Sequence, residues 1–196
     1  MRALRAAVVL VLALKLSTPV LAADLKAGLD AFQRDDYATA LKELRPLAEQ
    51  GNAEAQYYLG RIYSGGFGVT QDYAEAMKWY RLAAEQGDAA AQFFLGVIYE
   101  FGWGVSQDYT EAVKWYRLAA EQGDSNGQGT LGLMYDQGLG VSQDYVQALM
   151  WFILATERAS GRNFDALVSS RNDVEAKMTP EQIAEAQRLA REWKPK

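Results

Sequence analysis

One nine-residue pattern returns at a fixed interval along this chain. Gln-Asp-Tyr-x-x-Ala-x-x-Trp occupies residues 71–79, 107–115 and 143–151, so each copy starts 36 residues after the one before. A constant period of this length predicts a stack of small structural units. Stacks of this kind present long continuous surfaces, which more often bind partners than carry out chemistry.

Each unit carries the signals of two helices joined by a turn. Asn52 and its equivalents Asp88 and Asp124 can cap the start of a first helix with a side-chain oxygen. The turn holds paired glycines, as in Gly66-Phe67-Gly68-Val69, because glycine tolerates positive φ angles. Asp72-x-x-Glu75 then has the form of a capping box, and the second helix is expected to stop at Gly87.

Residues that recur in every unit are expected to be structural. Tyr63, Tyr73 and Trp79 have copies at each repeat, which favours core packing between successive helices over a ligand cage. The aligned glutamines are expected to hydrogen-bond the neighbouring turn. They are Gln56, Gln92 and Gln128.

The full pattern, Ala-x-Ala-Gln-x-x-Leu-Gly-x-x-Tyr followed by Gly-x-Gly-Val-x-Gln-Asp-Tyr-x-x-Ala-x-x-Trp, resembles the Sel-one-like repeat (SLR), a relative of the tetratricopeptide repeat. Residues 52–87 and 88–123 match it almost throughout, while 124–159 have Ser125 and Gly127 where the others have alanines. Gly127 and Gly129 each lower helix propensity by about 1 kcal/mol relative to alanine. We therefore expect this unit to be the softest part of the stack.

The ends of the chain depart from the repeat. Residues 23–51 resemble a divergent tetratricopeptide-like first repeat whose inter-helix turn is four residues shorter than the others. Residues 160–196 are expected to form C-terminal capping helices at 162–177 and 180–193, the second opened by a capping box from Thr179 to Gln182. The resemblance implies an all-α fold, a right-handed α-solenoid of helix-turn-helix repeats with a C-terminal helical cap.

Residues 1–22 have the pattern of a secretory signal peptide, with Arg2 and Arg5 before an apolar run and small residues near Ala22. We expect export to the periplasm or the medium of a Gram-negative-type bacterium, with no membrane insertion after cleavage. The segment holds three of the 20 Lys and Arg and none of the 25 Asp and Glu, which leaves 17 against 25, or −8. An acidic chain of this kind is not expected to bind nucleic acid.

The residue inventory argues against an enzyme. The chain has no histidine and no cysteine, which removes Ser-His-Asp and Cys-His catalysis and the usual zinc and haem ligands. We expect no catalytic residues, cofactor or metal. The resemblance implies a protein-interaction scaffold that holds a protein or peptide of unknown identity. The alternatives are a cell-wall protein that binds or hydrolyses peptidoglycan and a secreted effector that engages host proteins.

By similarity to tetratricopeptide repeats, a partner would bind along the concave face, which the first helix of each pair tends to line. The outward positions of these helices vary from unit to unit, and specificity can reside there. Tyr57 and Phe93 are the expected exposed anchors. A second possible surface is an apolar ridge formed by Phe67, Trp103 and Leu139 at the turns, unless each folds back. The predicted partner-binding residues are Glu54, Tyr57, Arg61, Phe93, Val97, Glu100, Leu133 and Asp136.

Overall fold

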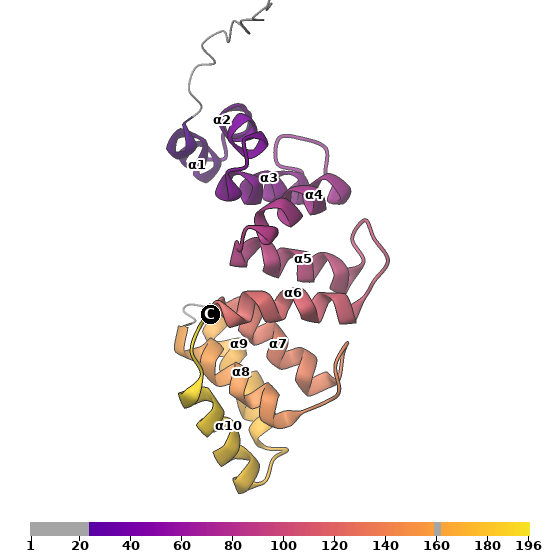
Figure 1. Ribbon diagram of the computed structural model, residues 1–196, viewed down its shortest axis with the longest axis vertical. Helices are drawn as coiled ribbons and strands as arrows, with labels where there is room; N and C mark the ends of the chain where they lie inside the picture. Colours follow the sequence, from indigo (N-terminus) through magenta and orange to yellow (C-terminus); the bar gives the residue numbers. More distant parts are fainter. Residues whose placement is uncertain (1–23, 159–161) are drawn as a thin grey trace, which may run out of the picture.

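The computed structural model describes residues 24–158 and 162–196, so the predicted signal peptide lies outside the described residues. In this part of the chain all regular structure is helical, which confirms the all-α solenoid. The helix pairs follow one another along the long axis of the molecule, from α1 and α2 at one end to α8, α9 and α10 grouped at the other (Figure 1). They are α1 Leu25–Gln33, α2 Tyr37–Glu49, α3 Ala53–Gly65, α4 Tyr73–Glu85, α5 Ala89–Phe101, α6 Tyr109–Glu121, α7 Ser125–Gln137, α8 Tyr145–Arg158, α9 Arg162–Glu175 and α10 Pro180–Glu192.

The first helix of each repeat begins where the sequence predicts. The side chain of Asn52 accepts a hydrogen bond from Ala55 N at 2.8 Å. Asp88 and Asp124 cap α5 and α7 in the same way. Each cap supplies a partner for one of the backbone N–H groups that a helix start leaves unpaired.

The second helices are capped, but not by the predicted reciprocal box. Asp72 accepts from the backbone N–H groups of Ala74 and Glu75, at 2.9 and 3.0 Å. Glu75 does not return a bond to the N-cap, because the Asp72 N–H donates to Tyr63 O at 2.9 Å and Glu75 accepts from Trp79 Nε1 at 2.8 Å. The tertiary contact with the first helix replaces the local one. The terminal box, Thr179 with Gln182, has both halves.

The paired glycines of each turn have the predicted backbone. Gly66 and Gly68 have φ angles of 67° and 68°, in the left-handed region that favours glycine. The second glycine also meets the preceding repeat: a Cβ on Gly68 would lie 2.8 Å from Tyr37 Cβ. The turn between α1 and α2 spans only residues 34–36, against 66–72 between α3 and α4, so it is four residues shorter, as expected.

A glycine in the middle of each first helix lets the second helix approach closely. A Cβ on Gly60 would lie 2.5 Å from Tyr80 Cδ1, and one on Gly96 would lie 2.5 Å from Tyr116 Cδ1. The rings of Tyr80 and Tyr116 are fully buried in these positions. The Leu-Gly pair of the repeat is therefore a packing requirement. Tyr80 and Tyr116 belong to the core, as does the predicted Trp79. Tyr63 and Tyr73, by contrast, are half-buried.

Buried glutamines join each repeat to the one before it, as predicted. Gln56 Nε2 donates to Ala48 O at 2.9 Å, and Gln92 Nε2 donates to Ala84 O at 3.1 Å. Gln92 Oε1 in turn accepts from Gln122 Nε2 at 2.7 Å. These bonds satisfy polar groups that would otherwise be buried without partners, so they fix the register between units.

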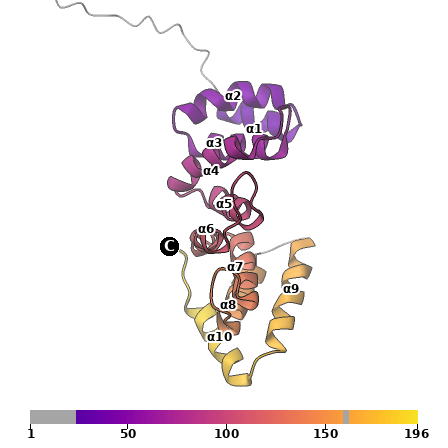
Figure 2. The same cartoon turned by 90° about the vertical axis from the view of Figure 1, so that its right-hand side faces the viewer.

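The C-terminal helices cover the last repeat. Both α9 and α10 pack against α8, and Figure 2 shows them on opposite sides of that end of the molecule. Leu154 of α8 is only 3% exposed, whereas its equivalents Leu82 and Leu118 are 41% and 43% exposed. Leu189 and Trp193 pack against the cluster that contains Leu154. The tail ends on α6, where Lys196 Nζ contacts Glu121 Oε2 at 2.9 Å.

Candidate functional site

The first helices α3, α5 and α7 carry the predicted partner-binding residues. We call the surface of Tyr57, Arg61, Phe93, Val97 and Leu133 the first-helix face. Close contacts at Gly60, Gly96 and Gly132 pack α3, α5 and α7 against α4, α6 and α8, so the face rests on densely packed helix pairs.

The structure divides the eight predicted residues into separate groups. Phe93 and Leu133 border one cavity, and Arg61 borders a second. The other five line neither of these two cavities. Glu54 is exposed and Leu133 is 37% exposed, while the remaining six are half-buried.

Tyr57 and Phe93 are half-buried, so the expectation of exposed anchors is wrong for both. The Tyr57 ring centroid lies 5.2 Å from that of Tyr58 and 6.1 Å from that of Phe94. Phe93 packs against the rings of Phe94 and Tyr116 at 5.4 and 5.6 Å. These ring contacts bury part of each side chain, so both residues contribute to folding as well as to any binding.

Two predicted carboxylates already have partners inside the molecule. Glu100 Oε2 accepts the hydroxyl hydrogen bond of Tyr116. Burial and this bond raise the pKa of Tyr116 above its ordinary value. Asp136 Oδ1 lies 2.8 Å from Lys177 Nζ, which ties α7 to the turn between α9 and α10. These acidic groups are used first for internal structure.

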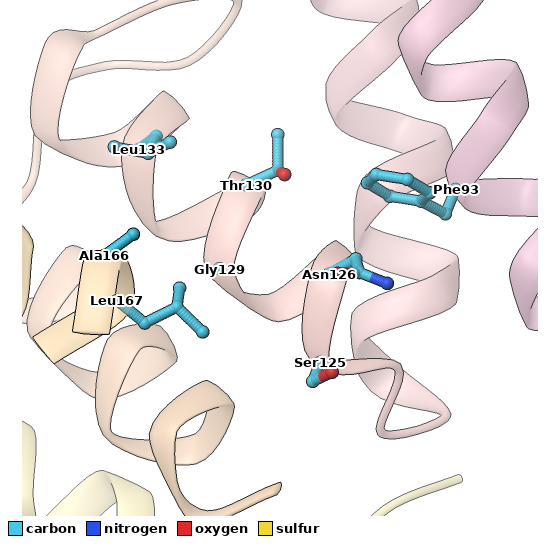
Figure 3. Close-up of a pocket in the computed structure, with 8 residues that line it drawn as sticks. All are labelled: Phe93, Ser125, Asn126, Gly129, Thr130, Leu133, Ala166 and Leu167. Atoms are coloured by element: carbon cyan, nitrogen blue, oxygen red, sulfur yellow. The ribbon is translucent and has the colours of Figure 1, made fainter. Parts of the chain in front are cut away.

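The first cavity, about 170 Å³ in volume, lies between α5, α7 and α9 (Figure 3). Phe93 of α5 lies on one side of it, Leu133 of α7 lies on the other, and Leu167 of α9 approaches Gly129. A Cβ on Gly129 would lie 2.5 Å from Leu167 Cδ2, so this glycine makes room for α9. Its full lining is Phe93, Ser125, Asn126, Gly129, Thr130, Leu133, Ala166 and Leu167.

Sequence reasoning missed the contribution of α9 to this cavity. The repeat pattern stops before Ala166 and Leu167, so no period indicates where they pack. The available signal was Gly129, which stands where the other repeats have the aromatic residues Tyr57 and Phe93. The expectation that α7 is soft stays a prediction, and the structure adds that its glycines permit close packing.

The turn residues do not form a continuous ridge. Phe67 stacks on Tyr37 with centroids 5.0 Å apart, and Trp103 stacks on Tyr73 at the same distance. Each ring folds back, but onto the preceding repeat, and Leu139 packs into the core in a similar way. Trp103 stays 38% exposed and stacks on Phe101, which is 56% exposed. An exposed aromatic pair therefore remains at one turn.

Acidic side chains are the candidate metal ligands among the described residues. No three Asp or Glu side chains there lie close enough together to hold a metal ion. The same part of the chain has no helix with the length and apolar character to cross a bilayer. What the first-helix face offers is apolar cavities between fixed helices, which suits binding of a side chain.

A family model described as Sel1 repeat matches residues 53–88, 89–124 and 128–160. A Sel1 repeat protein from Oxalobacter formigenes, known from its crystal structure, is 32% identical, with a TM-score of 0.68 over 85% of this chain and 74% of its own. No match is found among curated proteins.

A second similar structure is a protective antigen present in uropathogenic Escherichia coli strains, which displays an SLR fold. It is 33% identical, with a TM-score of 0.51 over 86% of this chain and 44% of its own length. The family model covers more than half of the chain, and the repeats it matches are the helix pairs described above. The protein therefore belongs to the Sel1 repeat family, whose members are generally protein-interaction scaffolds.

Proposed function

We propose that this protein is an exported scaffold that binds a segment of a partner protein on the concave face of its solenoid. The observation that carries this proposal is the cavity of about 170 Å³ bordered by Phe93 and Leu133. The residues that line it differ from repeat to repeat, so this part of the repeated fold can be specific for one partner. The residues that the repeats share are occupied with packing.

The chemistry of this cavity suits a peptide. Its apolar walls, Phe93, Leu133 and Leu167, can take one apolar side chain. Ser125, Asn126 and Thr130 also line it, and such polar groups can hydrogen-bond the backbone of a segment that passes over the opening. Few polar groups around an apolar pocket are the usual arrangement of a specific binding site.

Export is part of the proposal and has its support in the sequence. Residues 1–22 have the charged start, apolar run and small residues of a signal peptide. An oxidising compartment places no demand on a chain without cysteine. A fusion of residues 1–30 to alkaline phosphatase, which is active only after export, tests this part: activity is expected with the natural segment and is lost with Val9→Arg.

The binding surface is tested by site-specific cross-linking. A photoreactive amino acid placed at position 133 is expected to cross-link a partner in intact cells. The matched control carries the same group at Leu118, which is similarly exposed, at 43%, but lies on the second helix α6. Cross-linking from both positions alike, or from Leu118 alone, would contradict the proposed face.

A charged substitution adds an independent measurement. Leu133→Arg is expected to abolish binding of the partner that cross-linking identifies, because a cation would enter an apolar cavity. Leu118→Arg is expected to keep that binding. Both variants should keep the far-ultraviolet circular dichroism of the parent. Capture of peptidoglycan instead of protein, unaffected by Leu133→Arg, would replace the scaffold with a cell-wall function.

A further inference from the structure

The second cavity, about 250 Å³ in volume, lies where α3 and α4 meet α5 and the two neighbouring turns. Five aromatic rings line it, and those of Tyr80 and Phe94 stack with centroids 5.3 Å apart. An apolar cavity of about 150 Å³ is already large enough to hold benzene. This one can therefore take an aromatic side chain. The five rings belong to Phe67, Tyr73, Tyr80, Phe94 and Trp103.

Arg61 borders this cavity, and its guanidinium lies over aromatic rings outside the lining. Its guanidinium carbon lies 4.7 Å from the ring centroid of Phe32 and 5.6 Å from that of Tyr58. Among the residues that the structure describes, no carboxylate forms a salt bridge with it. Aromatic faces hold the side chain in place but do not neutralise it. The cavity therefore combines aromatic walls with a bordering arginine that has no carboxylate partner in the described part of the chain.

The equivalent positions in the next repeat have a different arrangement. Val97 stands where this repeat has Arg61, and Glu100 stands where it has Ser64. Glu100 accepts the hydroxyl hydrogen bond of Tyr116, whereas Ser64 shares a 3.0 Å hydrogen bond with Tyr80. The cation without an anion thus belongs to one repeat junction and is no property of the repeated frame. Because positions 61 and 64 differ between repeats, their side chains are available for recognition of a partner.

We propose that this cavity recognises an acidic aromatic motif of the partner, in which an aromatic residue is followed by Asp or Glu. The inference rests on the proposed scaffold function and adds the chemistry of the bound segment. The aromatic ring enters between Tyr80 and Trp103, and the adjacent carboxylate accepts from the Arg61 guanidinium. The exposed rings of Phe101 and Trp103 extend the apolar surface beside the opening.

Two capped tetrapeptides test the proposal: acetyl-Gly-Phe-Asp-Gly-amide and acetyl-Gly-Phe-Asn-Gly-amide. They differ only in charge. Binding is followed by NMR through the indole N–H of Trp103, which is assigned with Trp103→Phe. The Asp peptide is expected to bind at least about tenfold more tightly, since a charge-assisted hydrogen bond contributes this much. A third peptide, acetyl-Gly-Gly-Asp-Gly-amide, should bind far more weakly because it lacks the ring.

Variants copied from the neighbouring repeat separate charge from shape. Arg61→Val should remove the preference for Asp over Asn. Ser64→Glu places a carboxylate beside Arg61 and should also abolish it, whereas Ser64→Gln, which is the same size and neutral, should keep it. Equal affinity for the two Phe peptides, or equal behaviour of Ser64→Glu and Ser64→Gln, would overturn the proposal. Leu133 cross-linking that persists after such a result would leave the scaffold function standing.

Discussion

The replacement Gly96→Ala has opposite effects on the intrinsic stability of helix α5 and on its packing against α6. Alanine should favour an isolated helix by about 1 kcal/mol over glycine. In the folded protein, however, the new Cβ would lie 2.5 Å from Tyr116 Cδ1. Carbon atoms in contact need about 3.5 Å, so the ring must move by about 1 Å.

The tyrosine ring has little freedom to move, because it is fully buried and its hydroxyl is bonded to Glu100. Overpacking of this kind costs about 3 kcal/mol. After the helix gain of about 1 kcal/mol, the net loss of stability is about 2 kcal/mol, which corresponds to a melting temperature lower by about 4–8 °C. Thermal unfolding by circular dichroism and the urea midpoint both measure it.

Two further variants check the cause. Gly132→Ala should cost less, since its Cβ would lie 3.0 Å from Phe152 Cε1. Tyr116→Leu combined with Gly96→Ala should lose less stability than the sum of the two single changes, because the smaller side chain relieves the clash. A Gly96→Ala protein as stable as the parent, or more stable, would refute the packing explanation. Helix propensity would then determine the effect of the replacement on stability.

The remaining predictions concern pH and the buried glutamines. Burial raises the pKa of Tyr80 and of Tyr116 above the ordinary 10.0, so the unfolded chain ionises first as pH rises; stability should be full below pH 10 and fall above it. Urea midpoints at increasing alkaline pH should show this fall, and a smaller one in Tyr80→Phe. Gln92→Leu should cost about 2 kcal/mol in urea unfolding, since it leaves Ala84 O and Gln122 Nε2 without their buried partner. An unchanged midpoint would mean that water replaces both bonds.

Local signals in the sequence located most of the helices. Each N-cap residue acts on N–H groups within its own first turn, and each turn glycine acts on its own φ angle. Such short-range effects are readable from Asn52, Asp88 and Gly66 alone. The capping box at Asp72 failed because Tyr63 O, from the other helix of the pair, took the bond that a local reading assigned to Glu75.

The candidate site was predictable only in part. Arg61, Phe93 and Leu133 were found from their place in the repeat, since equal positions on equal helices point the same way. The sequence did not reveal that Tyr57 is half-buried or that α9 lies beside α7. Those facts depend on contacts between residues far apart in the chain, for which no spacing rule exists.

The sequence by itself determined that the chain is a stack of helix pairs. With a fixed period of 36 residues, every repeat has equivalent capping, turn and core residues and therefore forms the same helix pair. Tertiary structure alone decided where the stack is open. It closed the α8 surface with α10, left Leu118 exposed, and placed Leu167 against Gly129. The physical reason is that repetition fixes the contacts between neighbouring repeats, whereas the last repeat packs against α9 and α10, whose positions no period indicates.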